Sequence, residues 1–271
     1  MSAGDQLESG PRGAQNMISQ GSGRRASAAI LALSVAVSAC GGGSPTEPGM
    51  DLSDSVSLQG SSTLVFQDSG RLGDGRGDVE RLVRETLATA AAQVSLERVT
   101  VVVATGTDTV IPELGFGGRA DAGTVRMVFN TGSSLWQATL EAEFPPLLAH
   151  ELHHVARIRA VGFPDHLLDA LVLEGLADQF SRELLATPDA IWAVALTGSE
   201  LELWSQRAAE NYFNTDYNHN AWFFGTGNPP RWAGYSVGYK LAGDFLSANP
   251  GRTAASSVAE PSASFVGGTR R

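Results

Sequence analysis

Apolar positions change their spacing along the chain, which predicts a mixed first half and a helical second half. Residues 78–93 place valines and leucines three and four positions apart, the spacing of an amphipathic helix. Residues 98–106, RVTVVVATG, are a β-branched run that predicts a buried strand, and residues 124–132, TVRMVFNTG, alternate apolar and polar side chains as a second strand does. The glycine-rich residues 115–123 between them predict a loop.

Helical spacing prevails from Pro145 onward. Pro145 and Pro146 suit the first turn of a helix that ends at residues 162–164, Gly-Phe-Pro. Asp165 can cap the next helix, which runs to about residue 185. The remaining segments are expected to be a helical region from 187 through 204, a polar and aromatic loop at 211–230, a helix at 231–248, and a loosely packed tail from 249 onward. We therefore predict an α+β fold.

The N-terminus resembles an export signal. Arg24 and Arg25 precede the apolar run 26–39, which is too short to span a bilayer but suits a signal peptide. Residues 37–40, Val-Ser-Ala-Cys, resemble a bacterial lipobox, which implies cleavage and lipidation at Cys40. Cys40 is the only cysteine, so an intramolecular disulfide is excluded. The alternative is a buried free thiol after an ordinary signal peptide.

These features suggest a domain organisation. We expect residues 1–40 to be a lipoprotein signal peptide, with 1–16 an overlong start because Met17 begins a more ordinary signal. Residues 41–55, which include GGGSPTEPG, are expected to form a flexible tether, and residues 56–271 a single catalytic domain. The protein is then extracytoplasmic and anchored to a bacterial membrane through lipid on Cys40.

The charge of the chain bears on its partners. Lys and Arg number 19 against 29 Asp and Glu, a formal net charge of -10. A nucleic-acid partner needs a basic surface to neutralise phosphates, so we expect no such partner. We expect a monomer that meets a peptide or protein substrate.

The stretch LLAHELHHVARIR, residues 147–159, holds the candidate chemistry. His150 and His154 are four positions apart, so on a helix they lie about 40° apart on one face and can share a tetrahedral zinc. Glu151 stands beside the first ligand, where it can act as a general base; this is the logic of HExxH. His153 is then a neighbour, either solvated or in contact with a ligand. The alternative is an ordinary helix that carries a cluster of histidines.

The sequence offers a third metal ligand, which favours a catalytic metal site over a structural one. Glu174 follows His154 by 20 residues on the next predicted helix, among apolar residues where an unpaired charge would be costly. Two histidines and one glutamate leave a coordination position open, as catalytic zinc sites do. Asp178, four residues after Glu174, could accept a hydrogen bond from a ligand histidine. Arg157 could pair with either carboxylate.

HExxH followed by a glutamate on the next helix resembles the gluzincin peptidases. More closely, the blocks AHELHHVAR, EGLADQF, WFFG and PRWAGYSVGYKL resemble a bacterial family of predicted zinc-dependent proteases, over roughly residues 95–265. The resemblance implies a zincin-like fold, with a small β-sheet over an active-site helix and a mainly helical C-terminal half. It implies one zinc ion held by His150, His154 and Glu174, with Glu151 activating a zinc-bound water to hydrolyse peptide bonds.

Other residues are candidates for supporting roles. Tyr235 and Tyr239 lie four apart on the last predicted helix, and either phenol could stabilise the oxyanion or simply pack at the edge of the core. In zincins an edge strand pairs with an extended substrate, and residues 124–130 are the candidate strand here. His166 and His219 are expected to be ordinary surface or loop histidines.

Two other functions stay open. One is a metal-binding lipoprotein without proteolytic activity, although a purely structural site has no need of Glu151. The other is a zinc hydrolase of a non-peptide amide, because the same machinery hydrates other amides. The sequence has no GAMEN-like element for a free amino terminus, which favours an endopeptidase.

Overall fold

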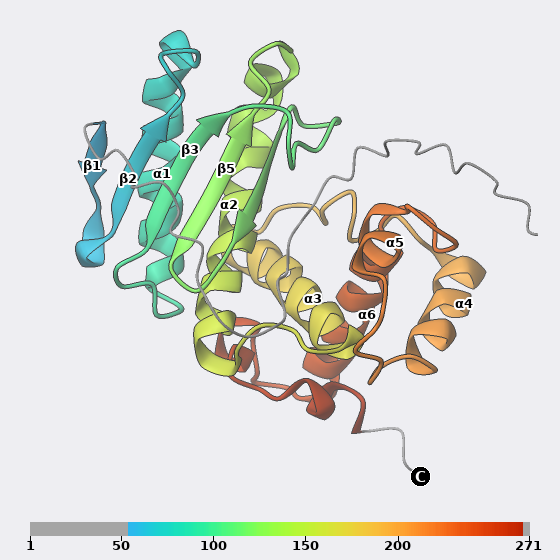
Figure 1. The fold of residues 1–271 in the computed structure, drawn as a ribbon. Helices are drawn as coiled ribbons and strands as arrows, with labels where there is room; N and C mark the ends of the chain where they lie inside the picture. The colour runs from blue at the N-terminus through green and yellow to red at the C-terminus, as the bar shows by residue number, and fades with distance from the viewer. Residues whose placement is uncertain (1–53, 268–271) are drawn as a thin grey trace, which may run out of the picture. The chain divides into compact units, whose positions relative to one another are not determined.

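The computed structural model describes residues 54–267, and the predicted signal peptide with Cys40 lies outside them. A five-stranded sheet occupies the first half, in the order β1-β2-β3-β5-β4 (Figure 1). β2, β3 and β5 are parallel, and the outer strands β1 and β4 are antiparallel to their neighbours. The strands are β1 (Ser55–Ser57), β2 (Thr63–Gln67), β3 (Thr100–Thr105), β4 (Phe116–Ala120) and β5 (Thr124–Phe129).

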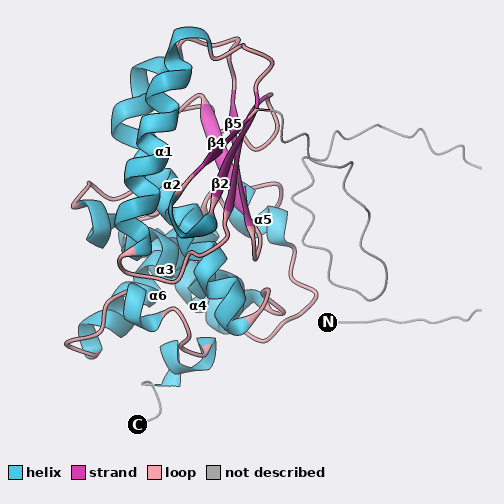
Figure 2. Ribbon diagram, turned by 90° about the vertical axis from the view of Figure 1, so that its left-hand side faces the viewer, coloured by secondary structure: helices cyan, strands magenta, loops and turns pink. Residues whose placement is uncertain are grey.

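Two helices lie side by side on one face of this sheet (Figure 2). The other helices pack on one another beyond the sheet. Helix α2 joins the two parts, because it packs on β4 and β5 and also on α3. The helices are α1 (Arg76–Ala91), α2 (Leu135–Val161), α3 (Leu167–Leu185), α4 (Gly198–Ala209), α5 (His219–Phe224) and α6 (Ala233–Ala248).

The sheet is held to α2 by a cluster of aromatic rings. Phe129 lies 5.5 Å from Trp136 and from Phe144, and Phe116 lies 5.8 Å from Phe144, measured between ring centroids. All four side chains are buried. This packing fixes β4 and β5 over the middle of α2, where the candidate site lies.

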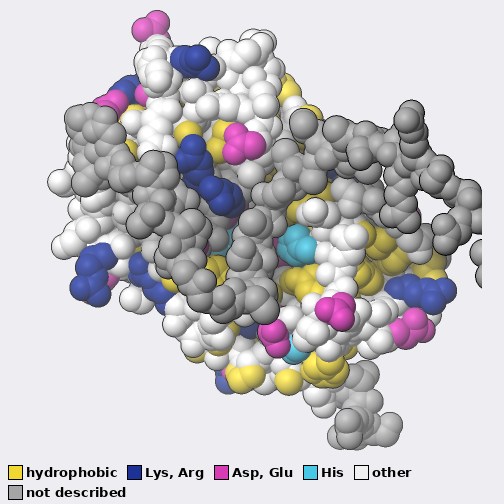
Figure 3. All heavy atoms as spheres, in the orientation of Figure 1, with side chains coloured by type: hydrophobic (Ala, Val, Ile, Leu, Met, Phe, Trp, Pro, Cys, Tyr) yellow, Lys and Arg dark blue, Asp and Glu magenta, His cyan; other side chains and the backbone are white. Residues whose placement is uncertain are grey.

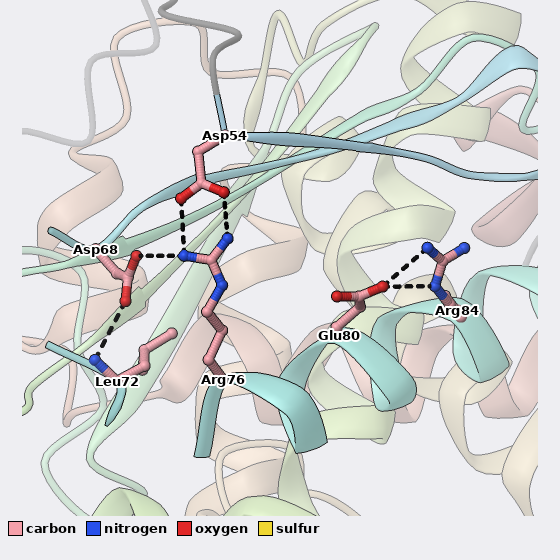
Figure 4. A network of polar contacts seen from close by, with 6 residues as sticks. All are labelled: Asp54, Asp68, Leu72, Arg76, Glu80 and Arg84. Atoms are coloured by element: carbon pink, nitrogen blue, oxygen red, sulfur yellow. Dashed lines mark hydrogen bonds and ion pairs between the residues drawn. The ribbon is translucent and has the colours of Figure 1, made fainter. Parts of the chain in front are cut away.

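An ionic network anchors the other helix of this layer (Figure 4). Arg76, at the start of α1, pairs with Asp54 just before β1 and lies 3.4 Å from Asp68 after β2. Asp68 also accepts the backbone N–H of Leu72 at 3.2 Å. The network ties the ends of two strands to one helix terminus, because a guanidinium can serve two carboxylates at once.

The glycine-rich residues predicted as a loop include strand β4. Residues 124–130 were therefore the wrong choice for an edge strand, because β5 is paired on both sides, with β3 and with β4. β4 is the edge strand next to α2, the helix that carries HELHH. Strands β1 and β2 are further elements that the hydrophobic pattern did not predict.

Helix α2 begins at Leu135, ten residues before the predicted start at Pro145. Its first turns carry Trp136, Leu140 and Phe144, which are buried against the sheet. Both prolines therefore lie inside the helix, where they remove two backbone N–H donors. Burial of the three apolar side chains outweighs that loss.

The tail beyond Asn249 is also packed more firmly than expected. Ala254 is fully buried and Phe265 is 7% exposed, and the Phe265 ring stacks on Phe245 of α6 at 4.1 Å. The prediction of a loosely packed tail was wrong, because residues of this segment are part of the hydrophobic core and pack against α3 and α6.

The prediction of an α+β fold is confirmed, and the arrangement, with a sheet over the helix that carries HELHH, is consistent with the zincin-like fold that the resemblance implies. Among the described residues, no helix has the length and apolarity needed to cross a bilayer. On the face shown in Figure 3, Lys and Arg side chains lie in small groups interspersed with Asp and Glu.

Candidate metal centre

Helices α2 and α3 are antiparallel, and their facing residues bring together three side chains that could bind a metal, two histidines and one glutamate. The Oε2 atom of Glu174 lies 3.1 Å from Nε2 of His150 and 3.3 Å from Nε2 of His154. One ligand atom from each of these three residues falls within 4.8 Å of the others. All three side chains are nearly inaccessible to solvent.

These separations fit a zinc ion. Zinc bonds to imidazole nitrogen and carboxylate oxygen are about 2.0–2.2 Å long, so two tetrahedral ligands are roughly 3.3 Å apart. The two measured Nε2 to Oε2 separations are close to that value. The donor set is therefore spaced for one small cation, with its nitrogen and oxygen atoms already converging.

The electrostatics of the centre favour positive charge. Burial alone would raise the pKa of Glu174, but the rings of His154 and His150 outweigh it and hold this pKa well below its usual range. Burial would likewise lower the pKa of His150, but Asp178 and Glu174 raise it well above its ordinary value. A buried site that stabilises carboxylates in their charged form is suited to a cation.

Asp178 orients one of the ligand histidines. Its Oδ1 atom lies 2.8 Å from Nδ1 of His150 and accepts the indole N–H of Trp192 at 2.9 Å. With its Nδ1 engaged in this way, His150 presents Nε2 to the ligand cluster. The structure thus places Asp178 where the sequence suggested, at the free ring nitrogen of a ligand.

Glu151 lies beside the ligands but is not one of the converging three. Its side chain is 5% exposed, and its Oε2 atom has no hydrogen-bond partner in the described part of the chain. Burial raises the pKa of Glu151. The carboxylate rests on strand β4, because a Cβ added at Gly118 would come within 2.8 Å of Glu151 Oε1. The glycine leaves room for the carboxylate.

Close helix packing brings the last predicted helix to this centre. A Cβ at Gly175 of α3 would fall 2.0 Å from the carbonyl oxygen of Gly238 in α6, so the two helices touch backbone to backbone. This contact places Tyr235 among Trp192, Phe223 and Phe224. Burial, and then the negative charges of Glu174, Glu151 and Asp178, raise the pKa of the Tyr235 phenol well above its usual value.

Tyr239 lies in a different environment. Its hydroxyl donates to Asp189, which also pairs with Arg182 at 3.0 Å. The hydroxyl is therefore engaged at the protein surface. Of the two tyrosines predicted for the oxyanion, Tyr235 packs against Trp192, whose indole donates to Asp178. Tyr239 is held at Asp189.

His153 and Arg157 point away from the ligands. His153 is fully buried rather than solvated: its ring lies 5.1 Å from that of Phe180, and its Nε2 lies 3.4 Å from the Ala254 carbonyl. Arg157 pairs with neither Asp178 nor Glu174. Its guanidinium donates to the carbonyls of Val258 and Glu260 and to the Ser262 hydroxyl. Both residues hold the tail.

Two residues of the predicted aromatic loop are partly buried and feel the charge of Glu174. Burial raises the pKa of Tyr217 to about 12, and the charge of Glu174 contributes. Burial lowers the pKa of His219, against an opposing effect of Glu174. His219 begins α5, stacks on Phe223 at 4.4 Å, and has its Nδ1 3.4 Å from the Tyr217 hydroxyl. His219 is therefore half-buried at the start of a helix and not in a loop as predicted.

Within the described part of the chain, His166 has no link to the candidate centre, in line with the expectation of an ordinary histidine. It caps α3, where its Nδ1 accepts the backbone N–H of Asp169 at 3.3 Å. This is a structural role at a helix terminus, because the first backbone N–H groups of a helix lack partners within it.

A family model described as "Predicted Zn-dependent protease (DUF2268)" matches residues 79–266, which include the sheet from β3 onward and every residue of the candidate centre. The chain belongs to this family. Two proteins of Bacillus subtilis (strain 168) are similar: uncharacterized protein YjaZ, 27% identical over 115 residues, and uncharacterized protein YjfC, 28% identical over 117 residues. The alignments cover 40% and 38% of this chain, and less than half of either relative, 44% and 39%.

Proposed function

We propose that the protein hydrolyses peptide bonds, with zinc held by His150, His154 and Glu174 and with Glu151 as the general base. The observation that carries the proposal is the free Oε2 of Glu151, buried next to three converging ligand atoms. A structural metal site requires only the ligands. A buried carboxylate kept free beside them is what proton transfer requires.

A bound zinc would act as a Lewis acid toward the scissile carbonyl and toward water. Glu151 would take the proton of the attacking water and pass it to the departing amine. Burial raises the pKa of this carboxyl toward the range in which it can both accept and release a proton. Asp178 would keep His150 in the tautomer that carries the proton on Nδ1.

Tyr235 is the group we propose for the developing oxyanion. No hydrogen bond of its hydroxyl to a described residue competes with that role, and its raised pKa keeps the phenol protonated. A neutral phenol can donate a hydrogen bond to an oxygen that gains negative charge.

Strand β4 is our candidate for contact with the substrate backbone. It forms one edge of the sheet and lies against Glu151 at Gly118. An extended peptide that pairs with residues 118–120 would pass in front of the base. Cleavage within a chain, as an endopeptidase does, follows if both ends of the peptide can extend along this edge.

The extracytoplasmic location is a separate part of the proposal and rests on residues 24–40 alone. Incorporation of labelled fatty acid into the wild type but not into Cys40→Ser would support it, and equal labelling of both would refute it.

The decisive experiment compares Glu151→Gln with the wild type in the full-length protein. We expect stoichiometric zinc in both, and peptide cleavage reduced by about 10²- to 10⁴-fold in the variant, because only the base is lost. Cleavage of a peptide library and zinc content are the two measurements. Glu143→Gln, on the same helix but outside the ligand cluster, is the matched control.

Each other outcome would change the proposal in a different way. Zinc without cleavage in the wild type would favour a metal-binding lipoprotein, or a hydrolase of another amide if non-peptide amides are cleaved. Full activity in Glu151→Gln would remove this residue from the mechanism. Absence of zinc from the wild type would refute the proposal.

A further inference from the structure

The segment between α3 and α4 contributes an indole to the candidate centre. It leaves α3 at Ala186, which has φ 52°, and returns through turns to α4 at Gly198. Within it, Trp192 is 6% exposed and donates its indole N–H to Oδ1 of Asp178 at 2.9 Å. The bond joins this segment directly to the carboxylate that orients a ligand.

Asp178 concentrates its hydrogen bonds on one oxygen. Oδ1 takes both the His150 ring nitrogen, at 2.8 Å, and the Trp192 indole, while the buried Oδ2 has no partner in the described part of the chain. A carboxylate with only one partner could rotate about its Cβ–Cγ bond. A second donor on the same oxygen fixes the plane of the carboxylate and thereby the ring of His150.

Helix α6 in turn holds the tryptophan in place. The Ser236 hydroxyl donates to the backbone carbonyl of Trp192 and accepts the backbone N–H of Leu196, both at 3.1 Å. Ser236 is 1% exposed. The Trp192 ring also lies edge-on to His150, at 6.3 Å between centroids. The indole is therefore fixed by its backbone, its ring contact and its hydrogen bond.

We propose that Trp192 is a positioning residue for the metal centre: its indole N–H locks Asp178, which holds His150 ready to bind zinc. The inference rests on the proposed function, because it requires that zinc binds at this site. Outer partners of a metal ligand affect metal affinity by about 10- to 100-fold. We expect an effect of that size from the N–H alone.

The test measures zinc affinity by competition with a chelator in the full-length protein. Trp192→Phe keeps an aromatic ring and removes the N–H, and we expect zinc to bind roughly 10-fold more weakly. The Co²⁺ absorption spectrum should change as well, since it reports ligand geometry. Trp222→Phe is the matched control: Trp222 is equally buried, and no hydrogen bond joins its indole to a described residue.

A second variant guards against a general loss of structure. A 3-benzothienylalanine at position 192 keeps the bicyclic shape and replaces the N–H with sulfur, so the core stays filled. Urea unfolding of the metal-free proteins shows whether stability has changed. Weaker zinc binding and an altered Co²⁺ spectrum in this variant, at unchanged metal-free stability, would support the positioning role.

Failure of the inference on Trp192 can be distinguished from failure of the proposed function. Wild-type affinity and spectrum in the benzothienyl variant would overturn the inference and leave the proposed function intact. Equal weakening in Trp222→Phe would also overturn it, because the effect would then be nonspecific. A wild type that binds no zinc would overturn both.

Discussion

Helix α2 has two buried polar faces that use the same residue types for different purposes. On the metal face, His150 and His154 meet the carboxylates of Glu174 and Asp178. On the tail face, His153 meets an aromatic ring and a backbone carbonyl. His153 and His154 are adjacent in the chain and both nearly inaccessible, so burial and residue type do not distinguish them.

The partners make the difference, and the electrostatics follow from them. Burial lowers the pKa of His153 well below its usual value, and electrostatic interactions with His154 and the Arg157 guanidinium lower it further, so His153 stays neutral. Burial lowers the pKa of Arg157 to about 10, and no carboxylate of the described residues forms an ion pair with it. The side chains of the metal face are thus arranged as a cation site requires, while Arg157 of the tail face donates hydrogen bonds to residues 258–262.

The largest contrast should come from the adjacent histidines. We expect His154→Ala to weaken zinc binding by more than about 100-fold, because a ligand contributes more than its outer partners do. His153→Ala should keep wild-type zinc affinity and lower the free energy of unfolding by about 2–4 kcal/mol through a buried cavity. Chelator competition and urea unfolding measure the two effects. Similar zinc loss in both variants would mean that the faces are not separate.

Arg157 offers the next test of the tail face. Arg157→Met keeps most of the side-chain volume but leaves the carbonyls of Val258 and Glu260 without their donor. We expect the free energy of unfolding to fall by about 2–3 kcal/mol, with zinc affinity unchanged. Arg71→Met is the control, because Arg71 is exposed and no hydrogen bond joins its side chain to a described residue; it should change stability by less than about 1 kcal/mol. A marked change in zinc affinity would contradict the separation of the two faces.

The sequence predicted the ligand arrangement because the information is local. The four-residue spacing of His150 and His154 fixes their common face in any helix, and a short turn suffices to bring Glu174 across from them. The tail face depends on residues about 100 positions away, at 254–262, and helical spacing carries no trace of such contacts. The role of His153 was therefore out of reach.

Strand β4 was missed for a related reason. The residues Phe-Gly-Gly-Arg-Ala have little intrinsic preference for a strand, and they form one because they pair with β5. The two glycines that argued for a loop are required by packing: a Cβ at Gly117 would fall 1.8 Å from the Thr109 carbonyl oxygen, and one at Gly118 would meet Glu151. The pattern could not show what presses against the strand.

A substitution at Gly118 should have the smallest effect, because it displaces Glu151, which is not one of the candidate metal ligands. In Gly118→Ala the new methyl would meet only side-chain atoms of Glu151, from Cγ to Oε1, so this side chain has to shift while the backbone can stay in place. We expect zinc affinity and stability near those of the wild type, and a kcat lower by roughly 10- to 100-fold, since a displacement of about 1 Å can cost that much. Peptide cleavage at saturating substrate measures the effect. Gly123→Ala, in the turn after β4 where the nearest atom is 3.9 Å away, is the control. Wild-type kcat in Gly118→Ala would show that the seat of Glu151 on β4 does not matter for catalysis, and loss of zinc would show that β4 supports the ligands as well as the base.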